Sequence, residues 1–359
     1  MATTTATQSL AMGPPTKSTA QTFLSSQFCT KPIRLTQVTP STSLSGKTAL
    51  ITGATTGIGY HAAHHLLSLN LSHLILAVRN TEKGNTVASE LRSKYPSATV
   101  TVEELEMSSS ASILSFISRL KSSPTKINIA ILNAAIFLQD TQLLNPFTLH
   151  NAVVQVNYIN TFLLFILLLP LLRSTNPADP GRLAIISSAG VHMAKVPHRN
   201  ARPFLPTFDS PESKLDPIEL YFSSKSIGQL FFVKLLQTYF PTPDDAGLIV
   251  NLVDPGYCKG TGLHRDTKGI MSRVFEFSKT LTARSQVDGA WTYVDAVVSK
   301  GKESHGSFVM DWEIKPFTSL AYTEEGQDLM DALFEETMAQ LEELDAGVRE
   351  ILEGFTRKK

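Results

Sequence analysis

Three side chains in the middle of the chain could move a proton to or from a carbonyl oxygen. Tyr221 and Lys225 stand four residues apart in YFSSK, which places a phenol and an amine on one face of a helix. A nearby ammonium stabilises phenolate and so lowers the pKa of a tyrosine from about 10 toward working pH. Ser188 closes an apolar run upstream and can hydrogen-bond a carbonyl oxygen, although a helix cap or a loop bond is an equally ordinary use. Together these groups predict acid–base chemistry.

A glycine-rich turn near the start of the chain is typical of a phosphate-binding site. Residues 52–59 read TGATTGIG and lie between an apolar run and an apolar helix. Such glycines allow a tight turn, let backbone amides approach a pyrophosphate, and direct a helix N-terminus at its charge. A glycine cluster also fits a mere turn, but its place between a first strand and a helix favours a dinucleotide site.

The end of the second apolar run bears on which dinucleotide is bound. Enzymes that prefer the unphosphorylated cofactor commonly carry an acid there to hold the ribose 2′-hydroxyl. This chain has Arg79 instead. A guanidinium can accommodate a 2′-phosphate, so Arg79 predicts NADP(H) as the cofactor. The alternative is an exposed arginine on a loop before a helix.

Short β-branched, apolar runs alternate with helical periodicity from Gly46 onward. The runs are residues 48–52, 73–78, 99–105, 127–132, 182–187 and 248–253. They predict an α/β fold: a Rossmann-type doubly wound parallel sheet of about seven strands, with helices on both faces, in a single domain. Ligands of such sheets bind beyond the carboxyl ends of the strands, where the functional residues should therefore gather.

The chain divides into three parts by composition. Residues 1–45 are rich in Ser and Thr and hold no acid, which predicts a flexible extension. Residues 46–320 form the predicted NADP-binding catalytic domain, in which the irregular stretches 191–217 and 256–284 are the expected substrate loops. Residues 321–359 have an apolar stripe opposite many glutamates, which predicts an amphipathic helix packed on or beside the domain.

Composition argues against several classes of protein. Basic and acidic residues number 32 each, so the chain lacks the basic excess typical of nucleic-acid binders. Its two cysteines lie far apart, which indicates neither a disulfide framework nor a thiolate zinc site and fits a reducing compartment. The histidines of the HAAHH segment at 61–65 could bind a metal, but no third ligand accompanies them. The favoured interpretation is a solvated or partly buried face of a helix. We predict no metal.

Targeting and membrane signals are weak. Residues 1–45 have few of the arginines expected of a transit peptide, and no charged segment leads into an apolar one as in a secretory signal. The apolar stretch 162–172 is shorter than the ~20 residues a membrane helix needs. We therefore expect a buried helix, no transmembrane segment and a cytoplasmic protein, with organelle targeting by residues 1–45 as the alternative.

With these motifs identified, the chain resembles the short-chain dehydrogenase/reductase family over about residues 46–310. The matches are TGATTGIG at 52–59, LNAA at 132–135, Asn157 in VNYINTF, Ser188 in IISSAG, Tyr221 and Lys225 in YFSSK, and Asp254-Pro255-Gly256. LILAVRNTEKG, FLLFILLLPLL and the long insert between Ser188 and Tyr221 are similar to the retinol-dehydrogenase-like branch and its fungal relatives. Many of those relatives serve polyketide or other secondary metabolism.

The resemblance implies four catalytic roles. Tyr221 would be the general acid that protonates the carbonyl oxygen as hydride arrives, or the base in the reverse direction. Lys225 would hold the nicotinamide ribose and depress the pKa of Tyr221. Ser188 would orient the substrate oxygen, and Asn157 would position a proton-relay water.

It also implies a set of cofactor contacts. Besides Tyr221 and Lys225, these are Gly53, Thr55, Gly57, Ile58 and Gly59 at the pyrophosphate, Arg79 at the 2′-phosphate, Asn133 and Ala134 on the adenosine side, and Pro255, Gly256 and Thr261 at the nicotinamide. The match at Thr261 is shifted by Lys259-Gly260. Glu106 stands where the family usually has an adenine-recognising aspartate, so its part in adenine binding is open, and Ala135 replaces a glycine.

The favoured hypothesis is an NADPH-dependent reductase or dehydrogenase that interconverts a ketone or aldehyde and an alcohol on a hydrophobic small molecule, such as a polyketide or other secondary-metabolite intermediate. One alternative is a non-catalytic NADP-binding sensor or scaffold, which would not need all four catalytic groups. Another is a retinol- or steroid-type dehydrogenase at a membrane surface. The helix at 158–172 leaves a further choice, between pairing in a homodimer and burial against the protein's own sheet.

Overall fold

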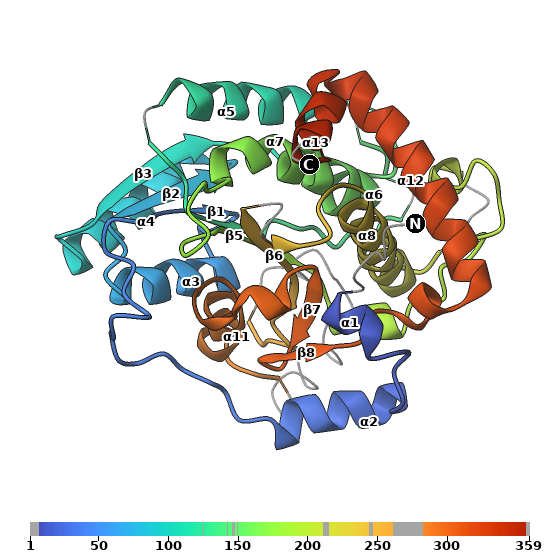
Figure 1. Ribbon diagram of the computed structural model, residues 1–359, viewed down its shortest axis with the longest axis horizontal. Helices are drawn as coiled ribbons and strands as arrows, with labels where there is room; N and C mark the ends of the chain where they lie inside the picture. Colours follow the sequence, from blue (N-terminus) through green and yellow to red (C-terminus); the bar gives the residue numbers. More distant parts are fainter. Residues whose placement is uncertain are drawn as a thin grey trace.

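The chain forms one eight-stranded sheet between two layers of helices (Figure 1). The computed structural model describes residues 7–356 except 124, 142, 146–147, 149, 211–214, 244–246 and 261–282. The strands are β1 (Thr48–Thr52), β2 (His73–Val78), β3 (Thr99–Glu104), β4 (Ile129–Leu132), β5 (Gly181–Ile186), β6 (Leu248–Asp254), β7 (Ser307–Met310) and β8 (Glu313–Lys315). Their order is β3-β2-β1-β4-β5-β6-β7-β8, parallel throughout except for the β7–β8 hairpin. The predicted doubly wound α/β fold is confirmed, and β7 and β8 are additions to the six runs.

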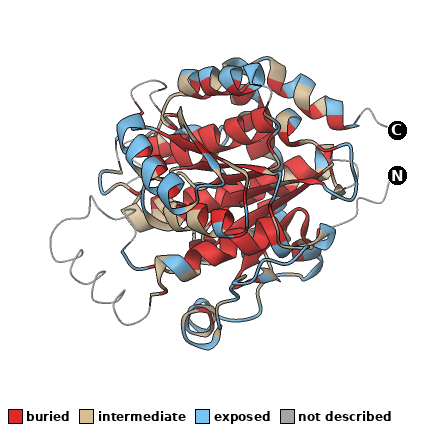
Figure 2. Cartoon of the chain, turned by 90° about the vertical axis from the view of Figure 1, so that its left-hand side faces the viewer, coloured by how far each residue is buried: buried red, intermediate tan, exposed pale blue. Residues whose placement is uncertain are grey.

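Two hydrophobic cores lie on opposite faces of this sheet. Along β1 the side chains alternate between them, with Leu50 in one core and Ala49 and Ile51 in the other. Because both faces of β1, β2, β4, β5 and β6 are covered, these strands are largely apolar runs, whereas the edge strand β3 (TVTVEE) is only partly buried. The buried centre and the exposed outer helix surfaces are visible in Figure 2.

The helices divide between the two faces. The side of Ile51 is covered by α3 (Gly57–Ser68), α4 (Thr81–Lys94) and α11 (Gln286–Val294). The side of Leu50 is covered by α5 (Ser110–Ser122), α7 (Asn160–Leu172), α8 (Pro217–Tyr239), α12 (Glu324–Leu344) and α13 (Gly347–Thr356). In Figure 1, α5 and α7 lie above the sheet, and α3 and α11 lie below it.

The most apolar helix is enclosed by the rest of the chain. A continuous helical stretch, Ala152–Leu172, comprises α6 (Ala152–Val154), a π-turn η2 (Gln155–Ile159) and α7, and is long and apolar enough to cross a membrane by length and composition. Its most apolar window is wholly buried inside the protein. The prediction of a buried core helix is confirmed, and a homodimer is not needed to cover this helix. The oligomeric state stays a prediction.

The C-terminal part forms two helices where the sequence predicted one. The chain breaks at Asp345 between α12 and α13. Both helices pack on the core: the Phe334 ring stacks on Phe231 with centroids 5.8 Å apart, and Phe355 lies 5.3 Å from Phe240. The break turns α13 back toward α7, where Phe355 also lies under the Arg173 guanidinium.

Residues 7–45 make specific contacts with the β7–β8 edge of the sheet. They include α1 (Gln8–Ala11), α2 (Thr19–Leu24) and a π-turn η1 (Ser25–Cys29). The Phe308 amide donates to Ser9 Oγ at 2.9 Å, and Tyr322 Oη donates to the Ser9 carbonyl at 2.7 Å. The sequence predicted a flexible extension, whereas this segment is attached to the domain. The attachment is made by single buried serines that hydrogen-bond polar groups of the domain, and composition alone does not identify such serines.

The predicted substrate loops are described only in part. Within 191–217 the structure has the 3₁₀ turn η4 (Leu205–Phe208), preceded by η3 (Ala189–His192) at the start of the insert. Phe204 and Phe208 are buried there with ring centroids 5.3 Å apart. Most of the second loop, including Thr261, lies outside the described residues.

Candidate active site

A cavity of about 1430 Å³ opens at the carboxyl edge of the sheet, where strand order reverses between β1 and β4. Pockets for one small ligand are usually about 300–1,000 Å³, so this one has room for a dinucleotide and a second molecule. Thirteen of the predicted site residues line it: Gly53, Thr55, Gly57, Ile58, Arg79, Glu106, Asn133, Ala134, Ser188, Tyr221, Lys225, Pro255 and Gly256. Gly59 and Asn157 lie behind the wall, and Thr261 is outside the described residues.

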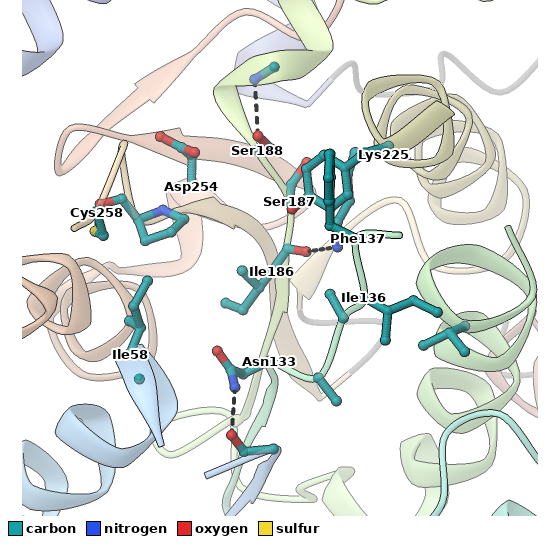
Figure 3. Close-up of a pocket in the computed structure, with 18 of the residues that line it drawn as sticks. Ile58, Asn133, Ile136, Phe137, Ile186, Ser187, Ser188, Lys225, Asp254 and Cys258 are labelled. Carbon is teal, nitrogen blue, oxygen red and sulfur yellow. Dashed lines mark hydrogen bonds between the residues drawn. The ribbon is translucent and has the colours of Figure 1, made fainter. Parts of the chain in front are cut away.

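Asn133 fixes the glycine-rich turn to the end of β4. Its Nδ2 donates to the carbonyls of Thr52 at 3.0 Å and Gly53 at 3.2 Å, and its Oδ1 accepts from Tyr293 Oη at 3.1 Å. Figure 3 shows one of the bonds donated by the Asn133 amide nitrogen. The amide is thus held from both ends by buried groups. Its role in the structure is to shape the glycine-rich turn that lines the cavity.

Gly59 explains why the turn needs a residue without a side chain. A Cβ at this position would lie 2.6 Å from Asn133 Nδ2. A side chain there would displace Asn133 and, with it, the turn. The helix α3 begins beside it at Gly57, and Thr56, Gly57 and Ile58 line the cavity. The Thr56 side chain makes no capping bond within the described structure, so the first amides of α3 have no side-chain acceptor there.

Arg79 and Glu106 form an ion pair at the end of the cavity where the sequence predicts the adenosine part of the cofactor. Arg79 Nε lies 3.5 Å from Glu106 Oε2, and the arginine side chain is 66% exposed. An exposed pair contributes about 0–1 kcal/mol, so the guanidinium can leave it for a phosphate at small cost. Lys83, in the first turn of α4, lines the same end of the cavity. It adds a second cation that the sequence analysis missed, although its place four residues after Arg79 could have indicated it.

Tyr221 and Lys225 project from α8 at the opposite end. Lys225 Nζ donates to the Ile186 carbonyl at 2.8 Å and lies 5.9 Å from the Tyr221 ring centroid. Burial lowers the pKa of Lys225 to about 8. Burial, followed by the charge of Asp254, raises the pKa of Tyr221 above its ordinary value.

The pKa of Tyr221 is shifted in the opposite direction to the one that the sequence predicted. The sequence analysis expected Lys225 to lower the pKa of Tyr221, but desolvation of the phenol outweighs any effect of the amine here. The amine is itself buried and directed at a backbone carbonyl. Tyr221 is therefore held in its protonated form, which is the form that donates a proton.

Asp254 couples the serine turn to the turn after β6. Its two carboxylate oxygens accept from the amides of Ala189 at 2.8 Å and Gly256 at 2.9 Å. Burial raises its pKa to about 6, against the effect of these bonds. Ser188 caps η3 by accepting from the Gly190 amide at 3.1 Å, and its hydroxyl proton can still be donated to a ligand. The carboxylate thus fixes the backbone directly after Ser188 and directly after Pro255.

Asn157 lies on the π-turn η2, one layer behind the cavity. Its Oδ1 accepts from the Ile136 amide at 2.9 Å, while its Nδ2 donates to the Ile136 carbonyl at 2.9 Å and to Ser224 Oγ at 3.2 Å. Ser224 Oγ in turn donates to the Tyr221 carbonyl at 2.7 Å. The asparagine therefore connects the cavity wall to the backbone of α8 at Tyr221, and its relay role stays a prediction.

The cavity around Tyr221 has predominantly apolar and aromatic walls. They include Phe137, Leu138, Ile218, Phe222, Met193 and Tyr257. His192 also lines this part, and burial lowers its pKa to about 4, so its ring is neutral. Among the described residues, no group of three or more His, Cys, Asp or Glu side chains could hold a metal ion.

The chain is similar in sequence to one family model and to proteins from fungi. Residues 47–199 match a family model described as short chain dehydrogenase. The short chain dehydrogenase/reductase mfmJ of Annulohypoxylon moriforme is 46% identical over 334 residues, which cover 93% of this chain and 94% of that protein. The short chain dehydrogenase virL of Hypocrea virens is 37% identical over 83% of this chain and 86% of its own length.

Solved structures share the fold at lower identity. A short chain dehydrogenase from Shigella flexneri, complexed with NADP, aligns over 75% of this chain and 98% of its own, at 20% identity and a TM-score of 0.54. One from Escherichia coli, complexed with NADPH, aligns over 75% of this chain and 98% of its own, at 20% identity and a TM-score of 0.52. These similarities show that the chain shares its fold with these structures.

Proposed function

The chain belongs to the short-chain dehydrogenase/reductase family, and on that basis we propose that it reduces a ketone or aldehyde on a hydrophobic small molecule with NADPH. The observation that carries the proposal is one cavity with different chemistry at its two ends. Arg79 and Lys83 lie at one end, and Ser188, Tyr221 and Lys225 lie at the other. A cation pair suits a phosphorylated ribose, and the second group suits proton transfer to a carbonyl. A sensor that only bound NADP would not require the second group.

The residues fit the cofactor, and the chemistry follows from their protonation. NADPH, when bound, supplies the hydride that reduces the carbonyl carbon. Ser188 donates a hydrogen bond to the carbonyl oxygen, and Tyr221 transfers its phenol proton to the same oxygen as charge develops there. The Lys225 ammonium stabilises the phenolate that remains. The products are an alcohol and the oxidised cofactor, and the raised pKa keeps Tyr221 in the protonated form from which reduction starts.

The apolar walls support a substrate with extended hydrophobic surface. A polyketide-like or other aromatic carbonyl compound fits the rings of Phe137, Phe222 and Tyr257 better than a small polar ketone does. The test is turnover of NADPH or NADH, followed by nicotinamide absorbance, with a panel of aromatic and aliphatic ketones and aldehydes. No turnover despite tight NADPH binding would favour the sensor hypothesis.

We expect Arg79→Ala to raise the Kd for NADPH by about 10- to 100-fold and to leave the Kd for NADH within about twofold, because a charge-assisted hydrogen bond contributes about 1.5–3 kcal/mol. Fluorescence titration measures both constants. Glu106→Gln is the matched variant: it frees the guanidinium from its 3.5 Å partner and should strengthen NADPH binding. Equal losses for the two cofactors would contradict the assignment of Arg79.

The pH dependence of reduction should report Lys225. Its pKa is lowered to about 8, so it is an ammonium below pH 8 and a neutral amine above. We expect kcat/KM to fall as pH rises through about 8, since the neutral amine no longer stabilises phenolate. Lys225→Met should reduce kcat/KM at low pH and abolish this fall. A profile of unchanged shape in Lys225→Met would show that another group titrates.

A further inference from the structure

We propose that residues 19–27 of the N-terminal segment form a wall of the substrate pocket, with Phe23 as a residue that selects bulky, apolar substrates. The substrate part of this inference rests on the proposed function. Thr19, Thr22, Phe23, Ser26 and Gln27 all line the cavity that contains Tyr221. They are more than 190 residues away from Tyr221 in the chain, and their composition resembles that of a linker.

A buried polar cluster anchors this wall. Ser26 Oγ donates to Asp311 Oδ1 at 2.8 Å, and Arg284 Nη2 donates to the Ser26 carbonyl at 2.6 Å and to Ser26 Oγ at 3.1 Å. Arg284 and Asp311 also form an ion pair, and both side chains are less than a tenth exposed. Polar groups buried to this degree need these partners, so Ser26 has a defined position on the domain.

The anchor adjoins the turn expected to hold the nicotinamide. A Cβ on Gly256, whose φ is +77°, would lie 2.5 Å from Arg284 Nη1. The Tyr257 carbonyl accepts from the Arg284 amide at 2.8 Å. One arginine thus contacts both the Pro255–Tyr257 turn and Ser26, which places the N-terminal wall at the end of the cavity where the reaction is proposed to occur.

Contacts on either side hold the rest of the segment in place. Ser9 bonds to Phe308 and Tyr322 before the wall, and Arg34 Nη2 lies 2.7 Å from Asp288 Oδ1 after it. Between these points the chain passes the cavity. In Figure 1, α1 lies beside β7, and α2 lies along the lower edge of the molecule beyond β8.

Phe23 is the aromatic residue among the five wall residues that line the cavity. Its ring lies 6.1 Å from that of Tyr257, tilted by 58°, and it remains 37% exposed. A ring left partly exposed beside another aromatic ring offers a surface to a flat apolar ligand. A bulky aromatic carbonyl compound can reach this surface from Tyr221, whereas a small aliphatic aldehyde has too little surface to do so.

The kinetic test compares Phe23→Ala with Phe28→Ala in the full chain. Phe28 lies five residues further on, is 58% exposed, and does not line the cavity. We expect Phe23→Ala to lower kcat/KM about tenfold for a bulky aromatic ketone and less than twofold for a small aliphatic aldehyde. Phe28→Ala should change neither, and NADPH affinity should be the same in all three proteins. An unchanged bulky-to-small ratio in Phe23→Ala would overturn the proposal.

A second test requires no turnover and separates this inference from the proposed function. In a Cys29→Ser background, Phe23→Cys combined with Tyr257→Cys should be joined by a short bis-maleimide, as detected by mass spectrometry of the linked peptides. Phe28→Cys combined with Tyr257→Cys is the control and should remain unlinked. If the wild-type chain reduces no carbonyl compound but the first pair is linked, the proposed function is wrong, while the position of residues 19–27 at the cavity is supported. Absence of the link, or equal linking of both pairs, would overturn the wall.

Discussion

Tyr221→Phe is expected to lower kcat for carbonyl reduction by about 10²- to 10⁴-fold, the usual contribution of a positioned general acid. The substitution removes one hydroxyl and leaves the ring that packs against Phe137 at a centroid distance of 5.9 Å. Burial and Asp254 keep the phenol protonated, so its proton is available in the wild type. Steady-state oxidation of NADPH with the preferred carbonyl compound measures the effect.

The matched control is Tyr239→Phe, which removes a hydroxyl at the far end of the same helix, outside the cavity. We expect it to retain full activity, and both variants to bind NADPH like the wild type. A Tyr221→Phe protein with more than a tenth of wild-type kcat would show that another group supplies the proton. Unchanged affinity with lost turnover would locate the defect in the chemical step.

The sequence predicted the first six strands, β1 to β6. Five of them are largely apolar runs because both faces of the sheet are covered there, and the edge strand β3 was identified by its alternating TVTV pattern. The observed limits agree with the predicted runs to within two residues, as for 127–132 and β4. β7 and β8 have four and three residues and, unlike the equally short β4 in the run 127–132, do not belong to a longer apolar run. The two-residue turn between them, Asp311-Trp312, has φ of +57° and +62°. Such a turn usually contains a glycine, which identifies it in a sequence, but this one does not.

The site was predictable to the extent that its chemistry is local in sequence. A glycine-rich turn and a Tyr-x-x-x-Lys pair each lie on one element, and the carboxyl ends of parallel strands bring them to one edge. The sign of the pKa shift at Tyr221 was not predictable, because it depends on burial by side chains from several elements. Nor was the position of Phe23, since its anchor joins Ser26 to Arg284 and Asp311 across more than 250 residues.

Breaking the ion pair between Arg284 and Asp311 is expected to give the largest loss of stability. Removal of one partner from a buried pair leaves an uncompensated charge and costs about 3–5 kcal/mol of the free energy of unfolding. Arg284→Met removes the cation and keeps a long apolar stem against Trp312, whose ring centroid lies 5.0 Å from the guanidinium carbon. Asp311→Asn removes the anion and keeps a residue that tolerates the left-handed φ of +57°.

The double variant decides whether the pair acts as a unit. Because no charge is left unpaired when both partners are replaced, Arg284→Met with Asp311→Asn should cost less than the sum of the single changes, by about 0.5–3 kcal/mol in urea unfolding. Simple additivity would mean that the two side chains stabilise the fold through separate contacts. The pair also holds Ser26, so Arg284→Met should expose residues 19–29 to proteolysis before the domain unfolds. Cleavage there at the wild-type rate would show that the contacts of Ser9 and Arg34 are sufficient to keep residues 19–27 on the domain.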